Sequence, residues 1–136
     1  MKKILGILLM ISVLFGGCSS LTTKNKRLVG KEYILIQENS IPNVLIGFDE
    51  HNFYGFSGLN NYFGRYEKKG NKIKLEKLGS TLMAGSDKVM KMESEYLEKL
   101  DTVQTFKVED DILIFNLKDG STLQYKENKK VDKKLK

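Results

Sequence analysis

From Leu28 onward the chain is built of short segments that favour β-strands, each bounded by residues that favour turns. The clearest turn is Asp119-Gly120, a dipeptide typical of two-residue hairpins, and Lys69-Gly70-Asn71 marks another. Eight strands are predicted: 33–36, 44–48, 52–56, 62–67, 72–78, 105–108, 112–117 and 122–125. An antiparallel sheet of this size protects its edges by closing into a barrel or by folding into two layers, and the sequence leaves both open.

One segment breaks this pattern. The stretch from Asp87 to Leu100 has no Gly or Pro, and Ser86 or Asp87 is suited to cap its beginning. Its apolar residues recur with a period of about 3.6 at Val89, Met92 or Glu93, Tyr96 and Leu100. The spacing predicts one amphipathic helix after the fifth strand, covering a face or an end of the sheet.

The first residues have the order of an export signal. Lys2 and Lys3 precede an apolar run from Ile4 to Phe15, which is too short to span a membrane, and Gly16, Gly17 and Cys18 follow. Small residues before a cysteine resemble a bacterial lipobox, so residues 1–17 are interpreted as a lipoprotein signal peptide. Cys18 is then the lipidation site, acylated with a fatty acid such as palmitate, and residues 18–27 form a tether. The alternatives are an ordinary signal peptide with a chance cysteine, or an uncleaved anchor.

This interpretation predicts a location in the cell envelope, with the membrane reached through Cys18. In a source with two membranes we expect the periplasmic side of the outer membrane. Lipidation also removes the only cysteine of the 136 residues from disulfide or nucleophilic chemistry. With a single His as well, no Cys/His metal cluster is possible, and no cofactor is predicted.

The formal net charge of +6 is carried by the two ends of the chain. Residues 18–125 hold 15 basic and 15 acidic residues, whereas the predicted tail, residues 127–136 with Lys126 before it, is rich in lysine. A domain that grips nucleic acid is usually basic, so no nucleic-acid partner is predicted. The tail is either a solvated terminus or a contact to an anionic membrane surface.

The residues between 55 and 66 carry a family resemblance. Gly55, Gly58, Asn60, Tyr62, Gly64 and Tyr66 follow the pattern G-x-x-G-C-N-x-Y-x-G-x-Y of the META-domain family, whose best-known bacterial branch is HslJ-like. Four other family motifs follow in the expected order. Residues 30–35 match the opening motif and residues 108–117 match the closing motif. Between them lie residues 79–85, which include Thr81, Met83 and Ala84, and residues 93–100, which begin with Glu93. The resemblance covers residues 28–126.

The resemblance implies a mainly β, barrel-like or two-layer domain with one covering helix. It places the family's two cysteines at Leu59 and Gly85, and the absence of both here is consistent with their pairing in relatives. The family's roles in heat and envelope stress, drug tolerance, secretion and motility imply a role of that kind, without a defined biochemical activity.

Each residue that could take part in chemistry also has a purely structural interpretation. The glycines at 55, 58 and 64 lack the Lys-Ser/Thr of a phosphate loop, and we interpret them as serving a tightly curved hairpin. Glu93 is either a titratable site residue or a structural tie to backbone amides or a lysine, and His51 is interpreted as a solvated turn residue. No nucleophile, base and oxyanion donors assemble, so no enzymatic activity is predicted.

Two functions remain after these exclusions. The first is an interaction or scaffold role with an unidentified envelope protein, and the alternative is a carrier or sensor of a small apolar ligand inside the barrel. Side chains that fill the interior would leave no room for a ligand. The residues expected to face inward are Phe48, Phe56, Tyr62, Ile73, Leu75, Met83, Leu113, Phe115 and Tyr125.

Overall fold

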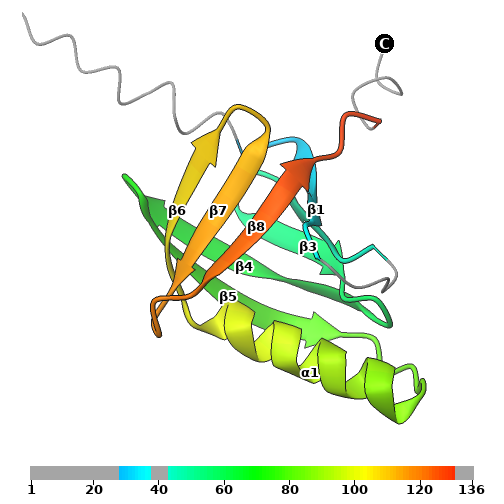
Figure 1. Cartoon of the computed structure of the whole chain (residues 1–136). Helices are drawn as coiled ribbons and strands as arrows, with labels where there is room; N and C mark the ends of the chain where they lie inside the picture. Colours follow the sequence, from blue (N-terminus) through cyan, green and yellow to red (C-terminus); the bar gives the residue numbers. More distant parts are fainter. Residues whose placement is uncertain (1–27, 38–42, 131–136) are drawn as a thin grey trace, which may run out of the picture.

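The structure is a computed structural model that describes residues 28–37 and 43–130. Eight antiparallel strands close into a barrel, and one helix lies between the fifth and the sixth strand (Figure 1). The elements are β1 (Lys31–Leu35), β2 (Leu45–Phe48), β3 (Asn52–Phe56), β4 (Asn61–Lys69), β5 (Lys72–Ser80), α1 (Asp87–Asp101), β6 (Val103–Glu109), β7 (Ile112–Leu117) and β8 (Thr122–Glu127). The predicted fold class is confirmed, and of the two architectures the chain adopts the barrel.

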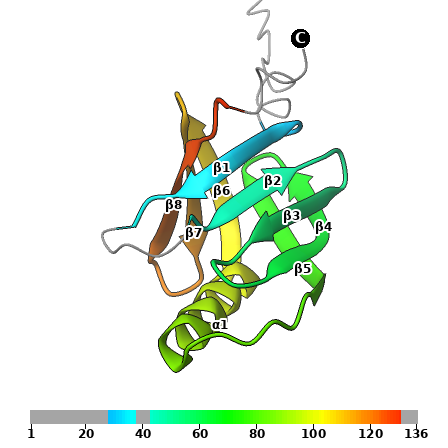
Figure 2. The same cartoon turned by 90° about the vertical axis from the view of Figure 1, so that its right-hand side faces the viewer.

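Each strand pairs with the next one along the chain, and the barrel closes where β1 meets β8 (Figure 2). In this last ladder Tyr33 lies opposite Glu127 and Leu35 lies opposite Tyr125. The predicted hairpin at Asp119-Gly120 forms, with Gly120 at a φ of 87°, a backbone conformation that glycine adopts without strain. The strands alternate between buried and exposed residues, as in β3, where Phe53 is buried and Tyr54 is exposed.

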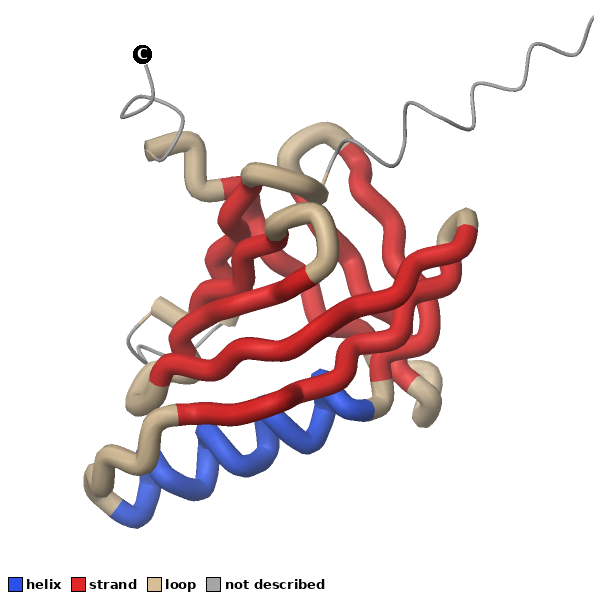
Figure 3. The backbone as a smooth tube through the Cα atoms, turned by 180° about the vertical axis from the view of Figure 1, so that it is seen from behind, coloured by secondary structure: helices blue, strands red, loops and turns tan. Residues whose placement is uncertain are grey.

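The helix α1 covers the place where the barrel is least tightly joined. Strands β5 and β6 are connected by one residue pair, Lys72 opposite Thr105, and then diverge. Seen from behind, α1 runs along β5 at this end of the barrel (Figure 3). Ser86 caps the helix by accepting a hydrogen bond from the Val89 amide, and Tyr96 and Leu100 are its buried residues, as predicted.

Aromatic and aliphatic side chains fill the barrel. The largest fully buried side chains are Tyr33, Tyr62, Tyr125, Phe48, Phe53, Phe115, Leu28, Ile46 and Leu113. Their rings meet edge to face: Phe48 lies 6.5 Å from Phe115, and Phe115 lies 5.6 Å from Tyr125 between ring centroids. Seven of the nine residues expected to face inward are buried.

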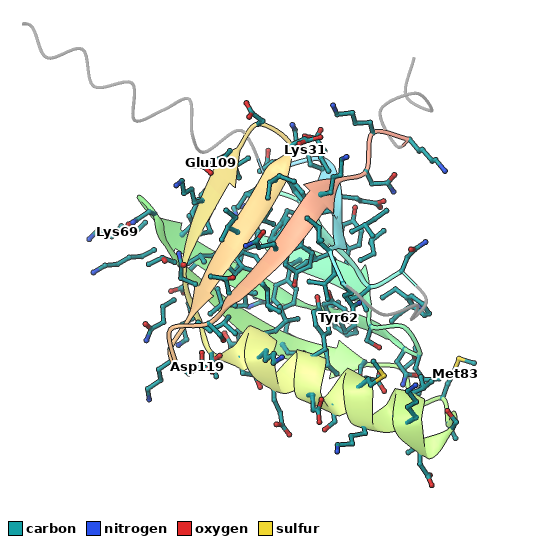
Figure 4. The ribbon with its side chains drawn as sticks, in the orientation of Figure 1. Lys31, Tyr62, Lys69, Met83, Glu109 and Asp119 are labelled. Atoms are coloured by element: carbon teal, nitrogen blue, oxygen red, sulfur yellow. The ribbon has the colours of Figure 1, made fainter. Side chains whose placement is uncertain are left out.

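The other two expectations need correction. Phe56, at the end of β3, is only half-buried. Met83 is 65% exposed, so the prediction that it faces inward is wrong. It lies beyond the end of β5, in the loop that leads to α1, and this loop is held through the Met83 backbone while the side chain points away from the barrel (Figure 4).

The folded domain begins and ends at the same seam. Leu28 is fully buried, and β8 extends to Glu127, one residue beyond the predicted domain boundary. Glu127 forms an ion pair of 3.0 Å with Lys31, and the Asn128 amide donates to the Glu32 carbonyl at 2.8 Å. The predicted signal peptide, Cys18 and the whole of the predicted tether lie outside the described residues, as do the last six residues of the tail. Within the described part of the chain, no helix is long and apolar enough to cross a membrane.

Candidate functional site

Polar residues from three separate segments meet at one end of the barrel. Ser57 and Asn60 belong to the turn between β3 and β4, Thr81 and Met83 to the loop between β5 and α1, and Glu93 to α1 itself. All except Ser57 are family-motif residues identified in the sequence. The structure therefore brings together residues that are up to 36 positions apart.

Asn60 is the centre of this polar cluster and is only 5% exposed. Its Oδ1 accepts from the Met83 amide at 2.6 Å and from Thr81 Oγ1 at 2.9 Å. Its Nδ2 donates to Glu93 Oε2 at 3.0 Å and to the Met83 carbonyl at 3.3 Å. An amide side chain offers two donors and two acceptor positions, so the hydrogen-bonding capacity of Asn60 is filled.

Glu93 holds the helix to the turn. Its Oε1 accepts from Ser57 Oγ at 2.5 Å, and its Oε2 accepts from Asn60, so both carboxylate oxygens are engaged. Ser57 Oγ in turn accepts from the Asn60 amide at 3.0 Å. Of the two interpretations of Glu93, this geometry is that of a structural tie, although its partners are side chains rather than the backbone amides or the lysine that were expected.

The motif glycines serve the backbone of the same region. Gly58 has a φ of 98° in the turn that carries Asn60, a conformation that side chains rarely adopt. Gly55 and Gly64 are needed for space instead. A Cβ on Gly55 would lie 2.1 Å from the Leu45 carbonyl oxygen, and one on Gly64 would lie 2.1 Å from the Glu76 carbonyl oxygen.

A chain of three tyrosine hydroxyls lies beside the polar cluster, inside the barrel. Tyr62 donates to the Leu45 carbonyl at 2.8 Å and lies 2.8 Å from the hydroxyl of Tyr96, which is 2.9 Å from that of Tyr125. Burial raises the pKa of all three hydroxyls well above the ordinary value for tyrosine. The sequence identified Tyr62 as a motif residue and the other two only as apolar positions, since nothing local indicates that their hydroxyls meet.

The remaining predicted residues lie apart from this cluster. Tyr66 donates to the Asp49 carbonyl at 2.7 Å, and its ring meets that of Phe48 edge to face. Ala84 is exposed in the loop before α1. His51 is exposed in the turn between β2 and β3, where its backbone amide and that of Asn52 donate to the Asp49 carboxylate and lower the pKa of Asp49.

The chemistry available to the cluster is limited by its own hydrogen bonds. Ser57, although next to a carboxylate, is 5% exposed. The described residues contain no group of three or more His, Cys, Asp or Glu side chains placed to hold a metal ion. The cluster is therefore built to fix the turn, the loop and the helix relative to one another.

Comparisons with known proteins agree with this architecture. No curated protein matches the sequence. Among solved structures, the fold is similar to an NMR structure of a protein from Burkholderia xenovorans, with a TM-score of 0.66 and 21% identity over 78% of this chain and 87% of that one. It is also similar to a DUF4847 family protein from Bacteroides vulgatus, with a TM-score of 0.61 and 12% identity over 78% and 98% of the two chains. The family model of the META domain matches residues 26–130, and the chain therefore belongs to the META-domain family.

Proposed function

We propose that this META-domain protein is a membrane-anchored lipoprotein of the cell envelope whose barrel acts without catalysis, as an interaction or scaffold domain. The order of Lys2, Lys3, the apolar run and Gly16-Gly17-Cys18 supports the anchor at Cys18. Relatives' association with envelope stress and drug tolerance gives the setting in which such a domain would act.

The observation that carries the interaction role is a group of exposed apolar side chains near the polar cluster. Phe63 and Leu78 lie on β4 and β5, next to the bulge between these strands, and are 53% and 52% exposed. Leu82 and Met83 follow in the loop after β5, at 94% and 65% exposed. We call these four residues the apolar corner.

Leu82, the most exposed residue of the apolar corner, contributes little to the fold of its own chain. A leucine that is 94% exposed buries almost none of its surface, so it stabilises the domain little. Single exposed apolar residues are ordinary, but several on one corner are typical of a surface that contacts another protein. The polar cluster holds the backbone of this loop in place, which keeps such a surface preformed.

The packed interior favours this role over that of a carrier. A carrier needs space inside the barrel, and here that space is occupied by buried rings such as Phe48, Phe115 and Tyr125. The outer surface is therefore where the domain meets its partner.

The anchor is tested with Cys18→Ser. Mass spectrometry of the original protein should find a lipid-modified Cys18 as its first residue, and the variant should carry no adduct and leave the membrane fraction. Retention of the variant in the membrane with residue 1 intact would identify an uncleaved anchor instead.

The apolar corner is tested by crosslinking in the protein's own membrane. A photoreactive amino acid at position 82 should give a discrete crosslinked species, and Leu82→Ser with Met83→Ser should abolish co-purification of that partner while leaving the melting temperature unchanged. The matched control places the photoreactive residue at Ser121, which is exposed in the turn between β7 and β8. The same products from both positions would contradict a specific interface at the corner.

A further inference from the structure

The hairpin formed by β4 and β5 concentrates the positive charge of the domain. Residues 65–77 contain six Lys or Arg and only two acids, Glu67 and Glu76, whereas residues 28–125 as a whole contain more acids than bases. The rest of the domain is thus acidic. This asymmetry lies within the folded part and is separate from the lysines of the tail.

The tip of the hairpin brings like charges together. Lys69 and Lys72 lie directly opposite each other on either side of the Gly70-Asn71 turn, and Lys69 projects outward from the tip (Figure 4). Like charges in directly opposed positions destabilise a hairpin unless an anion lies between them. Within the described residues, neither of these ammonium groups, nor that of Lys74, forms an ion pair with a carboxylate.

A cleft of about 650 Å³ opens beside these lysines. It lies where β5 and β6 diverge after their single residue pair, so one wall comes from the β4–β5 hairpin and the other from β6. Its lining comprises Glu67, Lys68, Lys69, Lys72, Ile73, Lys74, Val103, Gln104 and Thr105. Four lysines and one glutamate are therefore among the residues that line the cleft, and Gln104 and Thr105 are polar residues of the β6 wall.

Lys68 differs from the other three. It points toward the inner face of the hairpin, where its ammonium lies 5.6 Å from the centre of the Phe106 ring, and its partial burial lowers its pKa. A flat charged surface would meet Lys69 and Lys72 at the tip. A ligand that enters the cleft would also approach Lys68. The position of Lys68 therefore favours an extended anionic chain over a flat charged surface as the ligand.

We propose that this lysine cleft binds a soluble, multivalent anion of the phosphate class, such as a chain of linked phosphates. A lysine ammonium group attracts phosphate oxygens as a point charge and requires no fixed geometry. Residues i and i+2 of a strand are about 7 Å apart, so one chain of linked phosphates can contact several of these lysines. Single-stranded nucleic acid fits less well, because the aromatic ring beside the cleft, that of Phe106, is buried and offers no face for base stacking.

The probe is inorganic tripolyphosphate, titrated into the full chain in a nonionic detergent. The five tail lysines, Lys129, Lys130, Lys133, Lys134 and Lys136, are changed to Gln in every sample so that the tail does not contribute. Calorimetry should show saturable binding that weakens as salt is added, and amide NMR shifts should centre on Lys72 and Thr105. The double variant Lys69→Gln, Lys72→Gln should weaken binding by about tenfold or more. Lys68→Met, which keeps an apolar stem over Phe106, should weaken it as well.

The matched control removes the same charge elsewhere, with Lys88→Gln and Lys91→Gln on the exposed side of α1. Binding that falls equally in the control would reduce the effect to net charge and overturn the proposal. Absence of saturable binding at low salt would also overturn it. A third contrary result is binding to phosphatidylglycerol vesicles that needs Lys69 and Lys72 but not Lys68, since that would make the hairpin tip a membrane contact.

Discussion

The side chain of Leu59 lies directly over Gly85: a Cβ placed on Gly85 would be 3.0 Å from Leu59 Cδ1 and 3.8 Å from Leu59 Cγ. These are the two positions at which the family resemblance placed a pair of cysteines. The turn after β3 therefore does lie against the segment that enters α1, as the alignment requires. Leucine over glycine fills this contact with apolar packing where relatives are expected to have a covalent bond.

The first prediction restores that bond. The variant Leu59→Cys, Gly85→Cys, made with Cys18→Ser, should oxidise within the monomer, because the sulfur introduced at position 59 would occupy the place of Leu59 Cγ, beside the Cβ introduced at position 85. Closing a loop of about 26 residues stabilises by up to about 3–4 kcal/mol on the chain-entropy estimate. The loss of leucine packing reduces this gain, but Gly85 does not have the positive φ that would make its replacement costly.

Free-thiol titration under native, mildly oxidising conditions measures the outcome. The matched control pairs Leu59→Cys with Ser121→Cys in the distant turn between β7 and β8, and should keep two titratable thiols. Two free thiols in the Leu59/Gly85 variant, or only intermolecular dimers, would contradict the contact.

The second prediction concerns Gly58, whose φ of 98° excludes most side chains. Gly58→Val should cost about 1–3 kcal/mol and lower the melting temperature by several degrees, because valine is strained in this conformation. Equal melting temperatures for wild type and Gly58→Val would show that the turn relaxes without cost.

The third prediction tests whether Glu93 is needed for its hydrogen bonds or for its negative charge. Glu93→Gln should be mild, because a glutamine oxygen can accept from Asn60 while its amide donates to Ser57, whose own hydrogen can turn to the Asn60 carbonyl 3.1 Å away. Glu93→Ala leaves one N–H of the Asn60 side chain without an acceptor, since Ser57 can still turn to the Asn60 carbonyl, and should cost about 1–3 kcal/mol. Chemical denaturation of both variants measures the difference. A Gln variant as unstable as the Ala variant would show that the negative charge itself is required.

The fourth prediction follows from the direction of the tyrosine chain. A carbonyl oxygen only accepts, so Tyr62 donates to Leu45, Tyr96 donates to Tyr62, and Tyr125 donates to Tyr96. Tyr96→Phe therefore leaves the Tyr125 hydrogen without its acceptor, whereas Tyr125→Phe leaves no buried hydrogen unpaired. We expect Tyr96→Phe to be the more destabilising, by about 1 kcal/mol or more in the free energy of unfolding. The reverse order would require the chain to run the other way.

The fifth prediction is a loss of stability in alkali. The pKa values of Tyr62, Tyr96 and Tyr125 are raised in the folded state, so their contribution is fully present below the unfolded pKa of about 10 and is lost as pH rises through the folded values. Between these two pKa values a tyrosine is ionised in the unfolded state but neutral in the folded state. Each such tyrosine lowers the free energy of unfolding by about 1.4 kcal/mol per pH unit. Absorbance at 295 nm should show these tyrosines ionising together with the loss of circular dichroism. Their independent titration in the folded protein would contradict the burial of the chain.

Local patterns were sufficient to predict the elements of this fold. Alternating burial and the Asp119-Gly120 turn define strands over a few residues, and the spacing from Val89 to Leu100 defines the helix, so these predictions agree with the structure. Closure was not predictable in the same way. The pairing of Tyr33 with Glu127 joins the two ends of the domain, and no local pattern distinguishes it from the edges of a two-layer sheet.

The candidate site was predictable in its members but not in its contacts. The family motif identified Asn60, Thr81 and Glu93, yet their hydrogen bonds depend on how β3, β5 and α1 meet in space. Met83 was misplaced because an apolar residue in a motif was taken as a core residue, whereas its backbone is the part that the motif uses. Ser57 was missed because serine is common in turns, and nothing in the sequence around it indicates that it contacts Glu93 on the helix.

The order of the strands has a consequence for how the chain folds. Seven of the eight ladders join strands that are neighbours in sequence, and the ladder between β1 and β8 is the exception. Local pairings incur little loop-closure entropy, so hairpins such as β7–β8 can form early, and the slow step is the search that brings the first strand to the last. Mutations in β1 that weaken this closing ladder should therefore speed unfolding more than they slow folding, and an open, eight-stranded sheet is the intermediate from which the protein would aggregate.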